Sequence, residues 1–233
     1  MRGIQKKMKN LVVIALGFIA IPIGFMGTFL FNLGYFFQEI FIFSGFTLVV
    51  IFTNMTFHKN RRLYPNLILV FGIILGLIQL IFHSIEIFTP YNFYYERVAF
   101  DIPYTLLIFN WLSWSSYSAY KFFKDQDIAP WIKIRYKIVG IFSFILSFHN
   151  IPEFFQPVGT TWGDYTNITS LIVFGITAIL AVIFSLGFAF AWIMPNWLKR
   201  RYDKEYHPPK DIELSEEDLM DLIKKQLSNG NKK

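Results

Sequence analysis

The sequence predicts an all-α, polytopic integral membrane protein: a six-helix transmembrane bundle with both termini in the cytoplasm. The 233 residues are 54% hydrophobic and only 16% charged, whereas a soluble domain usually carries about 25% charged residues. The hydrophobic residues gather in long blocks, and a helix of about 20 apolar residues crosses a bilayer. The basic residues fall between alternate blocks, which is the pattern expected of cytoplasmic links.

The first two predicted spans cover about residues 11–31 and 35–57. A basic flank that includes Lys6 precedes the first span, as it also would in a signal peptide. The apolar run is too long for a signal peptide, and no A-x-A-like cleavage site follows it, so we expect a retained span. Basic residues, among them Arg61, follow the second span and mark a cytoplasmic link.

The third span, about 66–88, has no Asp, Glu, Lys or Arg before Glu86. Its Gly72 and Gly76 form a GxxxG pair, which predicts that another helix approaches closely on that face. Near the end of the span, His83 and Glu86 are three residues apart and therefore share one helical face. This span combines a packing face with a polar outer end.

The last three spans cover about residues 101–120, 134–155 and 166–197. The fourth is the most polar and carries Asn110 and Ser113 about half-way across the bilayer. Polar groups at this depth either form hydrogen bonds between helices or line a path for a solute. The sequence leaves both interpretations open.

The six spans form one domain over residues 1–202, and a cytoplasmic tail follows over 203–233. Within the tail, residues 215–227 combine an N-cap candidate, Ser215, with an apolar stripe on one side of a short helix. We expect this amphipathic helix to dock a protein partner. A homo-oligomer or a larger membrane complex is also compatible with the sequence.

Charge gives the orientation. Every one of the 22 Lys and Arg residues except Arg97 lies at the N-terminus, in the second-to-third or fourth-to-fifth link, or near the C-terminus. The opposite side holds Arg97 and six acids: Glu39, Glu86, Glu96, Asp101, Glu153 and Asp164. The positive-inside rule then predicts cytoplasmic termini in a plasma-membrane protein. It also explains the net charge of +6 without a nucleic-acid partner.

The outer helix ends hold the candidate site residues. The candidates for binding a cation or small ligand are Glu39, His83, Glu86, Asp101, Asn110, His149 and Glu153. His83, Glu86, His149 and Glu153 would be the ligands if a divalent metal binds, because imidazole and carboxylate are common metal ligands. The alternative is that the acids simply mark helix ends among wet lipid headgroups. No HxxxH pair is present, and the absence of Cys excludes thiolate ligands and disulfides.

These observations favour a non-enzymatic protein: a sensor, receptor or accessory subunit with an outward-facing acidic pocket and a partner-docking tail. The first alternative is a small secondary transporter or channel that uses the polar fourth span. A third interpretation is an intramembrane metal-dependent enzyme. No cofactor is predicted apart from the divalent metal, and the partners expected are the lipid bilayer and a protein, not a nucleic acid.

Overall fold

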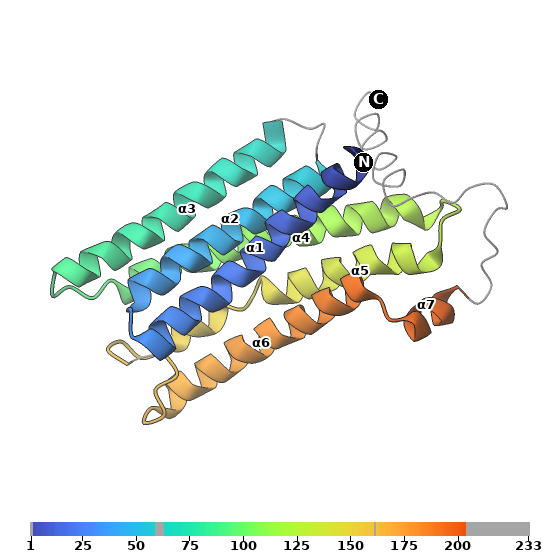
Figure 1. Cartoon of the computed structure of the whole chain (residues 1–233). Helices are drawn as coiled ribbons and strands as arrows, with labels where there is room; N and C mark the ends of the chain where they lie inside the picture. Colours follow the sequence, from blue (N-terminus) through green and yellow to red (C-terminus); the bar gives the residue numbers. More distant parts are fainter. Residues whose placement is uncertain (1, 59–62, 161, 204–233) are drawn as a thin grey trace.

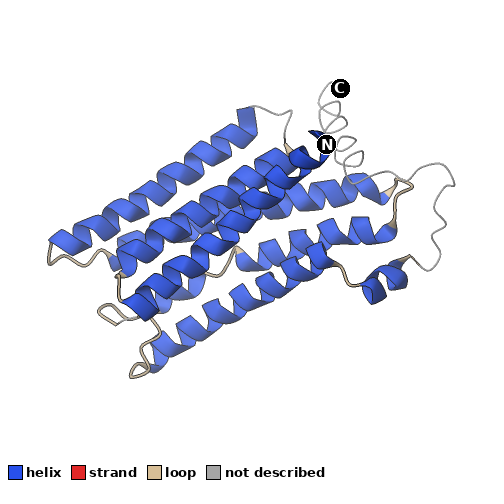
Figure 2. Ribbon diagram, viewed as in Figure 1, coloured by secondary structure: helices blue, strands red, loops and turns tan. Residues whose placement is uncertain are grey.

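A computed structural model describes residues 2–58, 63–160 and 162–203 of the chain. Within these ranges the protein is entirely helical, with seven α-helices, one short 3-10 helix and no strand (Figures 1 and 2). In chain order the elements are α1 (Arg2–Phe31), α2 (Tyr35–Phe57), α3 (Leu63–Phe88), α4 (Tyr94–Lys124), α5 (Pro130–Leu146), η1 (Ile151–Phe155), α6 (Ile168–Ile193) and α7 (Asn196–Tyr202). The predicted helix over 215–227 lies outside the described residues.

Five segments of the described chain are long and apolar enough to cross a membrane. They are Lys9–Phe31 of α1, all of α2, α3 and α6, and Pro130–Phe155, which joins α5 to η1. Large apolar side chains such as Ile179 remain exposed on the outside of the bundle, where lipid replaces water as the solvent. The helical fold class is therefore confirmed, and the chain is an integral membrane protein that contacts lipid.

The helix ends differ from the predicted span ends for local reasons. Helix α4 is 31 residues long and extends past the predicted span at both sides, from Tyr94 to Lys124. Helix α5 ends at Leu146 because Pro152 has no N–H to continue it, and turns lead into η1 instead. Helix α6 ends where Met194 adopts a left-handed conformation, with φ of 34°.

Consecutive long helices run antiparallel, so the bundle has two chemically distinct ends (Figure 1). The basic end is where α1 and α5 begin and α4 and α6 end, and the acidic end is the other. Helix α2 is central and packs against α1, α3 and α4; α4 also packs against α3 and α5, and α6 packs along α5. Helices α1 and α6 thus lie at the two ends of this series of contacts.

Glycines permit the closest helix contact, between α1 and α2. A Cβ at Gly17 would lie 3.1 Å from the carbonyl oxygen of Gly45, and one at Gly24 would lie 2.9 Å from that of Gln38. Backbones approach this closely only where no side chain separates them. Since α1 is held against α2 in this way, its other side is left facing α6.

The GxxxG pair of α3 is buried, and its two glycines have different surroundings. A Cβ at Gly76 would overlap the ring of Phe43 and lie 3.0 Å from Tyr104 Cζ, whereas one at Gly72 meets only Leu107, at 3.9 Å. The predicted close contact is therefore confirmed at Gly76, and it is loose at Gly72.

We predict that Gly76→Ala lowers the free energy of unfolding by about 1–3 kcal/mol, the usual cost of overpacking a core. The matched change Gly72→Ala is expected to be neutral or to stabilise by up to about 1 kcal/mol through helix propensity. Thermal unfolding of both variants in detergent measures the difference. Equal stability of the two variants would contradict this packing.

Candidate functional site

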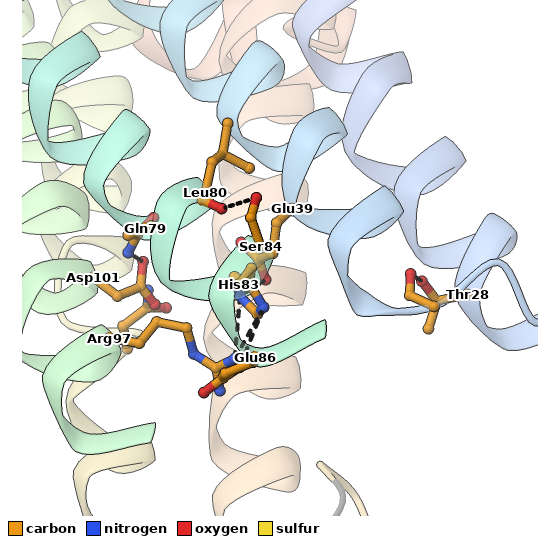
Figure 3. Close-up of polar contacts among 11 residues, drawn as sticks. Thr28, Glu39, Gln79, Leu80, His83, Ser84, Glu86, Arg97 and Asp101 are labelled. Atoms are coloured by element: carbon orange, nitrogen blue, oxygen red, sulfur yellow. Dashed lines mark hydrogen bonds and ion pairs between the residues drawn. The ribbon is translucent and has the colours of Figure 1, made fainter. Parts of the chain in front are cut away.

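Charged side chains from three helices meet at the acidic end of the bundle. Arg97 on α4 lies with its Nη1 3.0 Å from Glu86 Oε2 and 3.0 Å from His83 Nδ1, both on α3. Glu39 on α2 completes the group, with its Oε1 3.7 Å from His83 Nε2. Figure 3 shows Arg97 reaching across to His83 and Glu86. The four residues tie α2, α3 and α4 together at their polar ends.

Arg97 is the hydrogen-bond donor to both His83 and Glu86 in this group. A guanidinium has only donors, so the His83 nitrogen that faces it accepts and carries no proton. The predicted pairing of His83 with Glu86 is present, since Nδ1 and Oε2 are 3.8 Å apart, but Arg97 is the closer partner of each. Sequence reasoning missed this role, although Arg97 was the one basic residue on the acidic side.

Asp101 is held by amides rather than by a cation. The side-chain amides of Gln79 and Asn150 both donate to its carboxylate, one to each oxygen. Asn150 also donates to Thr105 Oγ1 at 2.9 Å. Gln79 and Asn150 are buried, so this network connects α3, α4 and the turn after α5. Asp101 is thereby a structural element of the acidic end.

His149 and Glu153 lie in the turn and the 3-10 helix after α5, so they do not share one α-helical face. His149 Nδ1 is bonded to the carbonyl oxygen of Leu146 at 3.1 Å, and its ring lies edge-to-face with Phe46 and Phe109. The Glu153 carbonyl accepts a 2.6 Å hydrogen bond from the Tyr94 hydroxyl. This contact fixes η1 against the start of α4.

The proposed metal ligands do not form a coordination cluster. Among the residues that the structure describes, no group of three His, Asp or Glu side chains is placed to hold a metal ion. His83 is instead directed at Arg97, a cation that would compete with a metal. A divalent site built on His83, Glu86, His149 and Glu153 therefore has no geometric support.

The polar residues of α4 bind neighbouring helices. Ser113 donates to the carbonyl oxygen of Gly140 on α5 at 2.8 Å, and Trp111 Nε1 donates to Asn54 Oδ1 on α2, also at 2.8 Å. Asn110 is half-buried. These bonds favour the interhelical interpretation of the fourth span over a solute path.

A cavity of about 900 Å³ extends from the acidic end into the bundle between α1, α2 and α6. Five of the predicted site residues line it: Glu39, His83, Glu86, His149 and Glu153. Asp101 and Asn110 are not part of its wall. The cavity has a size typical of ligand-binding pockets. Its wall brings together predicted site residues that are far apart in the sequence, since Glu39 and Glu153 are separated by 114 positions.

Two buried acceptors in the cavity wall have no donor. Gln38 is 5% exposed and Gln156 is 2% exposed, and within the described part of the chain the Oε1 atom of each makes no hydrogen bond. The orientation of the Gln156 amide is fixed, because its Nε2 donates to the carbonyl oxygen of Thr160 at 3.1 Å. An unsatisfied buried acceptor costs about 1–3 kcal/mol. These atoms thus mark where a donor from a bound molecule would be stabilised.

A structured loop covers the acidic end of the cavity between η1 and α6. Gly159 and Gly163 adopt positive φ angles of 83° and 76°, which glycine reaches without a steric cost. Asp164 accepts hydrogen bonds from the hydroxyl and the backbone N–H of Thr166, and these bonds lower the pKa of Asp164. Asn167 then caps α6 by accepting from the N–H groups of residues 169 and 170.

The basic end of the bundle is closed by aromatic packing. Phe123 stacks on Tyr136 and Phe57 meets the same ring edge-on. The Arg135 guanidinium lies over the Trp131 and Trp192 rings. These side chains fill the space between α2, α4, α5 and α6, and none of them lines the cavity.

Comparison with known proteins gives no relative from which a function could be inferred. No family model matches the chain, no curated protein matches it, and no solved structure matches it. The functional argument therefore rests on the cavity and its chemistry.

We predict that Asn150→Leu lowers the free energy of unfolding by about 1–3 kcal/mol, because it removes a donor from the buried Asp101 carboxylate. Asn110→Leu is the matched control, since the described chain shows no side-chain hydrogen bond for Asn110. We expect this variant to keep the free energy of unfolding of the wild type. Thermal unfolding in detergent compares the two. A larger loss for Asn110→Leu would show that Asp101 does not depend on Asn150.

Proposed function

We propose that this protein is a non-enzymatic membrane protein, a sensor, receptor or accessory subunit, whose acidic-end cavity binds a small ligand with a positively charged donor group. The observation that carries the proposal is the set of unpaired buried acceptors in the cavity wall, on Gln38 and Gln156. A ligand N–H would satisfy them, and a positive charge would suit the carboxylates beside them.

The balance of charge supports a cationic ligand. Glu39, Glu86 and Glu153 line the cavity, and Arg97 is the one Lys or Arg in its wall. Arg97 is bonded to Glu86, and its single positive charge is outnumbered by the three carboxyl groups of the wall. The Oε1 atom of Glu39 lies 3.7 Å from His83 Nε2, which is longer than a hydrogen bond. A ligand ammonium paired with Glu39 would offset the cost of holding its carboxylate in a partly buried site.

The same geometry argues against the transporter alternative. A transport path has to continue to the other side of the membrane, whereas this cavity ends above the aromatic packing of the basic end. The Asn110 and Ser113 side chains, on which the path was predicted, are not in the cavity wall. A cavity that is closed at its inner end suits a binding and sensing role.

We further propose the six-span topology with α4 as the sixth crossing helix, and with the basic end in the cytoplasm of a plasma-membrane protein. The distribution of Lys and Arg supports this orientation. The cavity would then open outward, and the tail 203–233 would contact a protein partner inside the cell. A ligand bound outside and a partner bound inside are the two requirements of a sensor.

Cysteine labelling tests the topology cleanly because the chain has no native Cys. We predict that Tyr91→Cys and Tyr165→Cys, in exposed positions at the acidic end, react with a membrane-impermeant maleimide in intact cells. Asp127→Cys, in the link between α4 and α5, should react only after permeabilisation. If Tyr91→Cys and Asp127→Cys react from the same side, α4 does not cross the membrane.

Ligand binding is tested with n-butylammonium chloride titrated calorimetrically into the protein in lipid nanodiscs. We predict saturable binding that Glu39→Gln weakens at least about tenfold, because a charge-assisted hydrogen bond is lost. Glu96→Gln is the matched control, since Glu96 is exposed at the same end and outside the cavity wall. Equal affinity of the wild type and Glu39→Gln would contradict the proposed site.

A further inference from the structure

We infer that the ligand is a single-chain amphiphile with an amine headgroup, which enters the cavity from the bilayer through the gap between α1 and α6. The inference rests on the proposed function and specifies the substrate class of that same cavity. Three properties of the cavity carry it: its depth, the chemistry of its deeper wall, and the place where it opens.

The depth of the cavity matches one leaflet of a bilayer. Along α2 its wall extends from Tyr35 to Val49, and the part from Glu39 to Val49 is about 15 Å long at the helical rise per residue. The hydrocarbon core of a bilayer is roughly 30 Å thick. A headgroup at Glu39 would therefore lie at the interface while its chain extended inward to about the middle of the membrane.

The deeper wall is apolar and aromatic. Below the level of Glu39 and His83, most of it is formed by Phe18, Ile21, Ile42, Phe46, Val49 and Phe184, and the His149 ring and Ser185 are among its polar members. A small polar cation would leave this region empty, and an apolar cavity holds water poorly. An alkyl chain would fill it and gain the contacts that the lining side chains lack.

The cavity opens sideways onto the lipid-facing surface. Pro22 of α1 and Ala181, Val182 and Ser185 of α6 are exposed on the outside of the bundle and also form part of the cavity wall. Helix α1 packs along α2, and α6 packs along α5. The rings of Phe18 on α1 and of Phe184 and Phe188 on α6 are in contact. The exposed wall residues of α1 and α6 therefore mark the side opening of the cavity.

The headgroup is specified by the acceptors at the upper end. Gln38 and Gln156 each present an oxygen atom that has no donor within the described part of the chain, and Glu39 lies in the same wall. A primary ammonium supplies three donors and one positive charge. A carboxylate or phosphate headgroup supplies neither and would be repelled by the acids.

The test uses the full protein in nanodiscs and dodecylamine carrying a diazirine at the far end of its chain. Peptide mass spectrometry after illumination identifies the labelled positions. We expect labelling of α1 over 18–29 and of α6 over 174–185, and at least about tenfold less with dodecanoic acid carrying the same group. Ala181→Trp narrows the opening and should reduce labelling about tenfold or more.

Ile179→Trp is the matched control, because Ile179 lies on the same helix, is 60% exposed and is not in the cavity wall. Should Ala181→Trp fail to fold, Val182→Trp narrows the opening from an exposed position. Unchanged labelling in the narrowed variant, or equal labelling by the amine and the acid, would overturn the inference. If n-butylammonium binding persists in that case, the proposed function survives; if neither amine binds, the proposed function itself fails.

Discussion

Polar groups below the membrane interface need partners, and this need organises the acidic end of the bundle. Hydrocarbon offers no hydrogen bonds, so each buried charge or amide must be satisfied by another helix. Arg97 meets this need for Glu86 and His83, and the amides of Gln79 and Asn150 meet it for Asp101. These contacts hold α2, α3, α4 and the end of α5 in fixed positions. Two of the buried groups that remain without partners, the side-chain oxygens of Gln38 and Gln156, belong to residues of the cavity wall.

The division of the bundle into two ends follows from the same constraint. At the basic end, aromatic rings pack together and Arg135 lies over two of them. At the acidic end, the wall of the cavity contains the unpaired oxygen atoms of Gln38 and Gln156. An asymmetric bundle of this kind supports binding at one end and contact with a partner at the other, which is the requirement of a sensor or receptor.

Much of the fold was predictable, because long apolar blocks and the periodicity of helices are local properties of the sequence. The contact at Gly76 and the proximity of His83 to Glu86 followed from spacing within one helix. The cavity did not, since it depends on which faces of separate helices meet. Gln38 and Gln156 carried no signal in the sequence, because a glutamine near a helix end is usually solvated.

Arg97 was visible as the one basic residue on the acidic side. Only the fold shows that it contacts His83 and would compete with a metal ion for that side chain. Because α5 ends at Leu146, His149 and Glu153 do not lie on one α-helix. Pro152 was the residue in the sequence that indicated an early end of this helix.

The central claim is that the acidic-end cavity is a binding site for an amine-bearing ligand, and an experimental density map tests it most directly. The protein would be extracted in a mild detergent, without delipidation, and imaged by electron cryo-microscopy. We expect elongated density in the cavity, with its polar end within hydrogen-bonding distance of Gln38, Gln156 and Glu39. A cavity filled by rearranged side chains, with the two glutamine oxygens bonded to protein donors, would contradict the claim.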